Sequence, residues 1–310
     1  ATTANANTAV GNEALKANTT GADNTSVGYY SLNANTTASY NTAMGNSSLS
    51  KNTTGERNAA FGRTALDANT TGSYNTACGM HALLGNTTAN DNTAVGYYSL
   101  GQNTTGYSNS AVGREALNTN TTGSWNVAVG DLSLYSNTTG DHTIAVGHRA
   151  AYHNTTGTAN VTLGFRAAHD ATTGSYNVAI GYRALHDNGT GEKNVGIGYS
   201  ALTVNTSGAE NTGVGNLALV ANTTGSYNTS VGSLALDANT TGDYNTAVGR
   251  GALSLNTGSD GSTAVGYGAL QDSTGASNTA VGYVAMTANT TGSQNTACLL
   301  YTSPSPRDRG

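Results

Sequence analysis

Charged side chains able to bind a ligand recur at a fixed spacing in the middle of the chain. They stand 17 residues apart in three columns, namely Arg149, Arg166 and Arg183, then His169 and His186, then Asp170 and Asp187. Guanidinium groups bind carboxylates and phosphates through paired hydrogen bonds. These columns therefore suggest a patch for an anionic glycan or a receptor carboxylate. The alternative is a solvated edge on which the arginines and aspartates offset one another.

Metal binding and catalysis are less well supported by the same residues. His169 and His186 are potential metal ligands, but no third column of His or Cys accompanies them, and structural zinc sites take four ligands. Gly-rich phosphate loops need a strand–loop–helix context that this sequence lacks. Histidines and carboxylates occupy variable positions rather than one converging pocket. We therefore expect no metal, no cofactor and no enzymatic activity.

A repeated five-residue phrase, usually Asn-Thr-Ala-Val-Gly, must position these side chains. A fixed short period indicates stacked supersecondary units, so the sequence predicts an all-β, parallel β-solenoid with 17-residue coils. Positions are counted below from the closing glycine of the phrase, the anchor glycine. Successive anchors are 17 residues apart except for the last, which is 16 residues from its predecessor: Gly11, Gly28, Gly45, Gly62, Gly79, Gly96, Gly113, Gly130, Gly147, Gly164, Gly181, Gly198, Gly215, Gly232, Gly249, Gly266 and Gly282.

Each coil is predicted to contain two short strands and one corner. Position −1 is apolar in every copy and position −3 is mostly β-branched, so a strand over −4 to −1 should direct both inward, together with Leu at +4. A second strand is expected near +2 to +5. The corner at +7 to +10 is typically Asn-Thr-Thr-Gly, as at 69–72, and asparagines stacked there could form amide ladders. Positions −2 and +3 are always small, and we expect three chains to pack through them.

Composition narrows the class of protein. Only 9% of residues are charged and the net charge is −5, so the chain has no basic surface for nucleic acid. Before residue 298 all charges fall at +1, +2, +5, +6, +11 or +12, which are the expected outward corners. Cys78 occupies the −1 column and is expected to be an inert core residue. No apolar run is long enough to span a membrane, so we expect no membrane contact in this fragment.

The two ends of the chain differ from the repeat. Residues 298–310 break the pattern and match a translated sequencing adapter, so we expect them not to be native. Residues 1–4 fit the tail of a preceding unit. We therefore predict a single repeat array over residues 1–297, open at both ends, in a fragment of metagenomic type.

The phrase Asn-Thr-Ala-Val-Gly-x-x-Ala-Leu, with small residues at −2 and +3, resembles the head repeats of trimeric autotransporter adhesins. It is also similar to arrays in phage tail-fibre-like proteins. The resemblance covers residues 5–297, although the 17-residue period is longer than the adhesin unit. It implies a left-handed β-roll, a homotrimer, and attachment to host or matrix surface receptors or glycans. The implied location is extracellular, on the cell surface of an outer-membrane-anchored adhesin or on a virion tail fibre.

Two functions remain open at this stage. The first is a non-enzymatic structural and adhesive rod, the head or shaft of a surface adhesin or tail fibre. The second is a monomeric ice- or surface-lattice-binding solenoid, although Thr70 and Thr71 are adjacent and should point to opposite sides.

Columns of Tyr, such as Tyr182 and Tyr199, suggest either sugar-stacking surfaces or simple ladder packing. The Asn-Thr-Thr triplets are formal glycosylation acceptors, or asparagines required by the turn.

Overall fold

The computed structural model describes residues 6–298, and the chain divides into two compact units, Ala1–Thr173 and Gly174–Gly310. Every regular element in the described residues is a three-residue strand, and none is a helix. Apart from Cys298, the segment expected to be an adapter lies outside the described residues. The prediction of one uninterrupted array over residues 1–297 stays a prediction.

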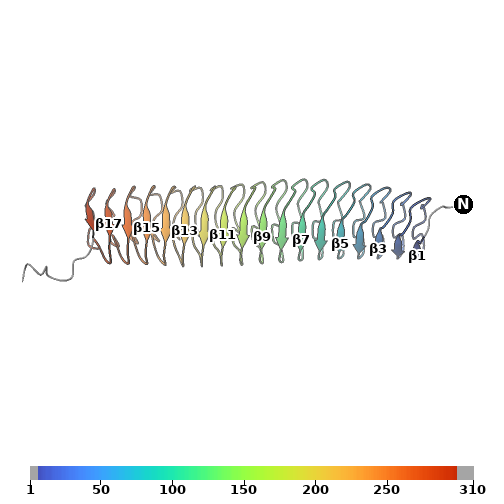
Figure 1. The fold of residues 1–310 in the computed structure, drawn as a ribbon, viewed down its shortest axis with the longest axis horizontal. Helices are drawn as coiled ribbons and strands as arrows, with labels where there is room; N and C mark the ends of the chain where they lie inside the picture. The colour runs from blue at the N-terminus through green and yellow to red at the C-terminus, as the bar shows by residue number, and fades with distance from the viewer. Residues whose placement is uncertain (1–5, 299–310) are drawn as a thin grey trace, which may run out of the picture. The chain divides into compact units, whose positions relative to one another are not determined.

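The first unit is a parallel ladder in which each strand pairs with the next one along the chain (Figure 1). Equivalent positions face each other, as Thr76 and Thr93 do. The strands are β1 (Thr8–Val10), β2 (Thr25–Val27), β3 (Thr42–Met44), β4 (Ala59–Phe61), β5 (Thr76–Cys78), β6 (Thr93–Val95), β7 (Ser110–Val112), β8 (Val127–Val129), β9 (Ile144–Val146) and β10 (Val161–Leu163).

The second unit repeats this arrangement. Its strands also pair in parallel with their sequence neighbours, in the same register. They are β11 (Val178–Ile180), β12 (Val195–Ile197), β13 (Thr212–Val214), β14 (Thr229–Val231), β15 (Thr246–Val248), β16 (Thr263–Val265), β17 (Thr279–Val281) and β18 (Thr296–Cys298). The prediction of an all-β, parallel β-solenoid with 17-residue coils is confirmed.

The anchor glycine ends each strand because no other residue fits there. Gly79 has a φ of 141°, and a Cβ built on it would lie 2.5 Å from the carbonyl oxygen of Gly96 in the next coil. A side chain would therefore be strained in its backbone conformation and would also collide with backbone. This contact explains why the glycine column recurs without exception.

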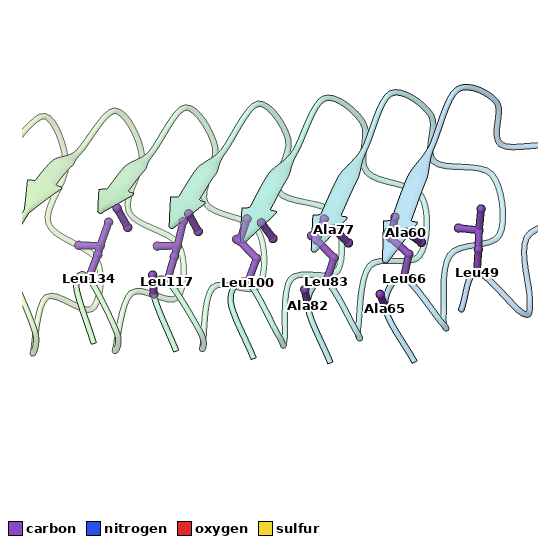
Figure 2. Packing of buried hydrophobic residues seen from close by; sticks show 14 of the residues in the cluster. Leu49, Ala60, Ala65, Leu66, Ala77, Ala82, Leu83, Leu100, Leu117 and Leu134 are labelled. Carbon is purple, nitrogen blue, oxygen red and sulfur yellow. The ribbon is translucent and has the colours of Figure 1, made fainter. Parts of the chain in front are cut away.

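The interior of the coil is lined by the small −2 and +3 residues and by Leu at +4, which corrects the prediction from the sequence. On β4 and β5, Ala60 and Ala77 are fully buried and point toward Leu66 and Leu83 (Figure 2). The −1 residues face outward instead, and Val95 is 36% exposed. The prediction that −1 and −3 line the interior is therefore wrong.

The narrow cross-section of the coil explains this inversion. A Cβ built on Gly196, a −2 residue, would lie 3.0 Å from Cγ of Leu185, and one on Gly213 would lie 3.2 Å from Cγ of Leu202. Even the methyl group of an alanine at −2 therefore packs tightly against the leucine side chain at +4. Small residues are required by the chain's own interior, so the prediction that three chains pack through this face is also wrong.

The second predicted strand, near +2 to +5, is absent from the described coils. These positions form turns in which +2 and +4 adopt left-handed backbone conformations, as in Thr64 and Leu66, both with a φ of 54°. A β-strand needs negative φ at each residue. Hydrogen bonds to neighbouring coils persist, because the Leu66 amide donates to the Ala82 carbonyl at 3.0 Å and the Thr64 amide donates to the Asn46 carbonyl at 2.9 Å.

Two buried columns of asparagine hold successive coils together, and the predicted amide ladder is confirmed in the +7 column. The side-chain amide of Asn69 donates to Oδ1 of Asn52 at 2.9 Å and to the Gly72 carbonyl at 2.9 Å. In the second column, at −4, the Asn75 backbone amide donates to Oδ1 of Asn58 at 2.9 Å. The Asn69 nitrogen that would carry a glycan is buried and bonded, so the turn interpretation of these asparagines is favoured.

Candidate functional site

The first unit brings four of the predicted patch residues onto its corners. Arg149 and Arg166 occupy +2 in successive coils, are half-buried, and have left-handed φ values of 54° and 52°. Their guanidinium carbons lie 5.4 Å from the Tyr152 ring centre and 5.5 Å from the Phe165 ring centre, within the range of cation–π attraction. Both guanidinium groups therefore lie against aromatic rings.

His169 and Asp170 form a close pair in the same unit. Nδ1 of His169 lies 2.6 Å from Oδ1 of Asp170, and the His169 ring stacks on Tyr152 at 5.3 Å between centres. His153 completes the group, with Nε2 3.6 Å from the same Asp170 oxygen. Ligand-type atoms of His153, His169 and Asp170 lie within 4.8 Å of one another.

His153 is the residue that the sequence reasoning missed. It lies at +6, one column beside His169 at +5 and directly in the Asp170 column. His153 does not belong to the +5 column that contains His169 and His186, so the pattern within that column does not reveal it. The signal in the sequence is position +6, which is His153 in one coil and Asp170 in the next. This position therefore places an imidazole and a carboxylate side by side in adjacent coils.

The second unit holds the remaining predicted residues. Arg183 lies at +2, is half-buried and has a φ of 52°. His186 is buried, and its Nδ1 is hydrogen-bonded to Oδ1 of Asp187. Each unit therefore repeats the same pairing of +5 imidazole with +6 carboxylate. The prediction that all seven residues form one patch stays a prediction.

Some other charged side chains on the corners pair with side chains of opposite charge, between coils or within one coil, as the solvated-edge interpretation expects. Arg114 makes a two-pronged contact with Asp131 of the next coil, with Nε to Oδ1 at 2.8 Å and Nη2 to Oδ2 at 3.1 Å. Hydrogen bonding to this carboxylate, together with its charge, raises the pKa of Arg114. Near the start of the chain, the hydrogen bond from Lys16, 2.8 Å away, lowers the pKa of Glu13.

The outward strand face is the second candidate site, and we call it the strand face. It consists of the −1 and −3 side chains of the strands, and none of these strands contains a charged residue. In the first unit its exposed members include Met44, Phe61, Val95, Val112 and Val129. Cys78 also lies on this face and is exposed, so the prediction of an inert core cysteine is wrong.

Aromatic rings form stacked ladders on the corners. In the second unit Tyr182 and Tyr199 stack with ring centres 5.2 Å apart, and Tyr227 and Tyr244 with centres 4.9 Å apart. Their exposed fractions range from 43% to 62%. The ladder packing suggested for these columns is present, and the rings still offer exposed edges to a partner.

A shallow hollow lies at one corner of the first unit. It is lined by Thr71, Ser73, Tyr74, Asn90 and Asp91. Asp91 is the one carboxylate among these lining residues, beside the hydroxyl groups of Thr71, Ser73 and Tyr74.

Comparisons of the chain with known proteins found no relative. A scan against models of protein families found no matching family, and searches of curated proteins and of solved structures found no match either. Within residues 6–298, no helix has the length and apolar character needed to cross a membrane. The function has to be argued from the geometry.

Proposed function

We propose that this chain is a non-enzymatic structural and adhesive solenoid, the head or shaft of a surface adhesin or tail fibre. The observation that carries this proposal is the strand face, which repeats outward-facing, half-buried or exposed, uncharged and mostly β-branched side chains in register along each unit. Contiguous exposed apolar surface of this kind usually marks an interaction site. Because the strand face repeats in every coil, it is suited to multivalent binding through many equivalent contacts.

The dimensions of the strand face support an interaction with another macromolecule. A three-residue strand is roughly 10 Å long and successive strands are about 4.8 Å apart, so each coil presents about 48 Å². The ten strands of the first unit then present about 480 Å² in total, shared between the apolar −1 column and a −3 column that is largely Thr, and the largest apolar patch of a monomer is about 300–600 Å². Such a face is large enough to be the centre of an interface.

The partner best suited to this face is a further copy of the same chain. Two copies share the same spacing between coils, so every −1 residue of one chain can meet a −1 residue of the other. We therefore retain the homotrimer proposal but transfer its interface from the −2 and +3 residues to the strand face. Attachment to a receptor or glycan would then use the corners, where the arginines and tyrosines lie.

Light scattering on the full chain tests this proposal. We expect a mass of several chains of 31.1 kDa each, and three chains if the homotrimer proposal is correct. Val95→Lys should lower the mass to one chain without loss of circular dichroism. Association should also slow the reaction of Cys78 with a maleimide, and Val95→Lys should restore it. Tyr244→Lys, an exposed corner variant, is the matched control and should leave the mass unchanged.

The second candidate, a monomeric ice- or lattice-binding solenoid, is favoured by a different property of the same face. The −3 column places the exposed Thr76 and the half-buried Thr93 beside the apolar −1 column, which makes a ladder of Thr and apolar side chains. The adjacent Thr70 and Thr71 are not the relevant residues, since the Thr70 hydroxyl donates to the Thr87 carbonyl at 3.0 Å. A folded monomer that shows thermal hysteresis of ice growth would replace the adhesin proposal with this one.

A further inference from the structure

We propose that His153, His169 and Asp170 form a binding site for a divalent transition metal such as Zn²⁺. The side chains come from two adjacent coils of the first unit, because His153 follows anchor Gly147, and His169 and Asp170 follow anchor Gly164. Their ligand atoms lie within 4.8 Å of one another. A metal here would link one coil to the next through side chains.

The distances between these atoms are close to those required for metal binding. Zn²⁺ bonds of about 2.0–2.1 Å to nitrogen and oxygen place the ligands of a tetrahedral site roughly 3.3 Å apart. Nε2 of His153 lies 3.6 Å from Oδ1 of Asp170, and Nδ1 of His169 lies 2.6 Å from the same oxygen. The first pair is nearly at the required separation. The second is a hydrogen bond that would open by about 0.7 Å when the metal takes the place of the shared hydrogen.

The surrounding rings hold both histidines in position before a metal binds. His169 stacks on Tyr152 at 5.3 Å with an angle of 10° between the rings. His153 meets the edges of Tyr152 at 4.6 Å and of His169 at 5.3 Å, with angles of 86° and 88°. The backbone amide of His153 also donates to the His169 carbonyl at 3.0 Å. Such support limits the side-chain reorganisation that binding requires.

The donor set determines which metals fit. Two imidazole nitrogens and one carboxylate oxygen favour Zn²⁺, Co²⁺ or Ni²⁺, whereas Ca²⁺ and Mg²⁺ prefer oxygen ligands. The side chains of His153 and Asp170 are 48% and 44% exposed, so a fourth position remains open to water or to a group from another molecule. Arg149, whose guanidinium rests on Tyr152, adds a positive charge nearby. The site should therefore bind zinc more weakly than a four-ligand structural site.

Titration of the full chain with ZnCl₂ and CoCl₂ in a non-chelating buffer tests the site. Calorimetry should show one saturable Zn²⁺ equivalent per chain. Co²⁺ should give visible bands without a thiolate charge-transfer band, which separates this site from Cys78. Saturating Zn²⁺ should raise the melting temperature, because a ligand bound only by the folded state stabilises it.

Two variants and one control make the test specific. His153→Gln and Asp170→Asn should each weaken Zn²⁺ binding at least tenfold and abolish the rise in melting temperature. Both side chains are partly exposed, so the fold should be retained, as circular dichroism can show. His142→Gln is the control, since His142 stacks on Trp125 in the same unit, outside the grouped ligands. Unsaturable binding, or equal affinity in the parent and His153→Gln, would overturn the proposal.

Discussion

Replacing one buried asparagine should destabilise the solenoid far more than its small size suggests. Asn69 is fully buried. Its amide donates to Asn52 and to the Gly72 carbonyl, and its Oδ1 accepts from Asn86 at 2.9 Å. Asn69→Ala removes all three hydrogen bonds. The Gly72 carbonyl keeps a bond from Asn58 at 2.8 Å, but Oδ1 of Asn52 loses its donor from the next coil.

The expected loss in the free energy of unfolding follows from these contacts. Three hydrogen bonds at about 1 kcal/mol each, with a further penalty of about 1–2 kcal/mol for the abandoned buried acceptor, give roughly 4–5 kcal/mol. Denaturant unfolding followed by circular dichroism measures this loss. Asn46→Ala is the matched control, because Asn46 is exposed, and it should change the free energy by less than about 0.5 kcal/mol. A loss below about 1 kcal/mol for Asn69→Ala would refute the reasoning.

Two further predictions concern the backbone and the charges. Ser277 is exposed with a left-handed φ of 58°, and the equivalent position one coil earlier is Gly261, with a φ of 69°. Ser277→Gly should therefore stabilise the second unit by about 0.5–1 kcal/mol in thermal melts, whereas Ser277→Val should destabilise it. The hydrogen bond from Lys16 lowers the pKa of Glu13 below its ordinary value of 4.5, so its stabilisation is complete above that value and is lost as pH falls through the folded-state pKa. Carboxyl NMR titration should find the Glu13 pKa raised in Lys16→Gln relative to the parent chain, and an unchanged pKa would contradict the role of Lys16.

The period, the strand position and the asparagine ladder could be predicted from the sequence because each depends on local rules. The anchor glycines fix the coil length, as Gly79 shows by its contact with Gly96. β-branched residues favour the strand. Asn69 occupies a corner and is repeated in every neighbouring coil, so its amide has an equivalent amide to bond with on either side.

Which face of each strand points into the coil could not be predicted from local rules. The larger apolar area of Val favours placing Val rather than Ala inside, but the space opposite Leu185 and Leu202 admits only the smallest side chains. Position −2 carries no charged residue because it lies in the chain's own interior, and not because a second chain packs there. Burial depends on the width of the coil, which is set by turns at +2 and +4 that no strand pattern reveals.

The candidate site was predicted only in part for a related reason. Arg149, Arg166, His169 and Asp170 were found because each repeats its own column. His153 was not found, because its partners lie in the neighbouring coil at +5 and +6. Whether side chains of two different columns touch depends on the backbone geometry of the turn that carries them. The residue types found within a single column do not reveal that geometry.

The most direct test of the account is a comparison of two adjacent lysine substitutions on β6. Ala94 is fully buried and Val95 is 36% exposed. Burying a lysine ammonium without a partner costs several kcal/mol, so Ala94→Lys should lower the free energy of unfolding by that amount or prevent folding. Val95→Lys at the same concentration should keep the folded circular dichroism spectrum and change this free energy much less. The reverse order would show that the −1 residues line the interior and would contradict the account.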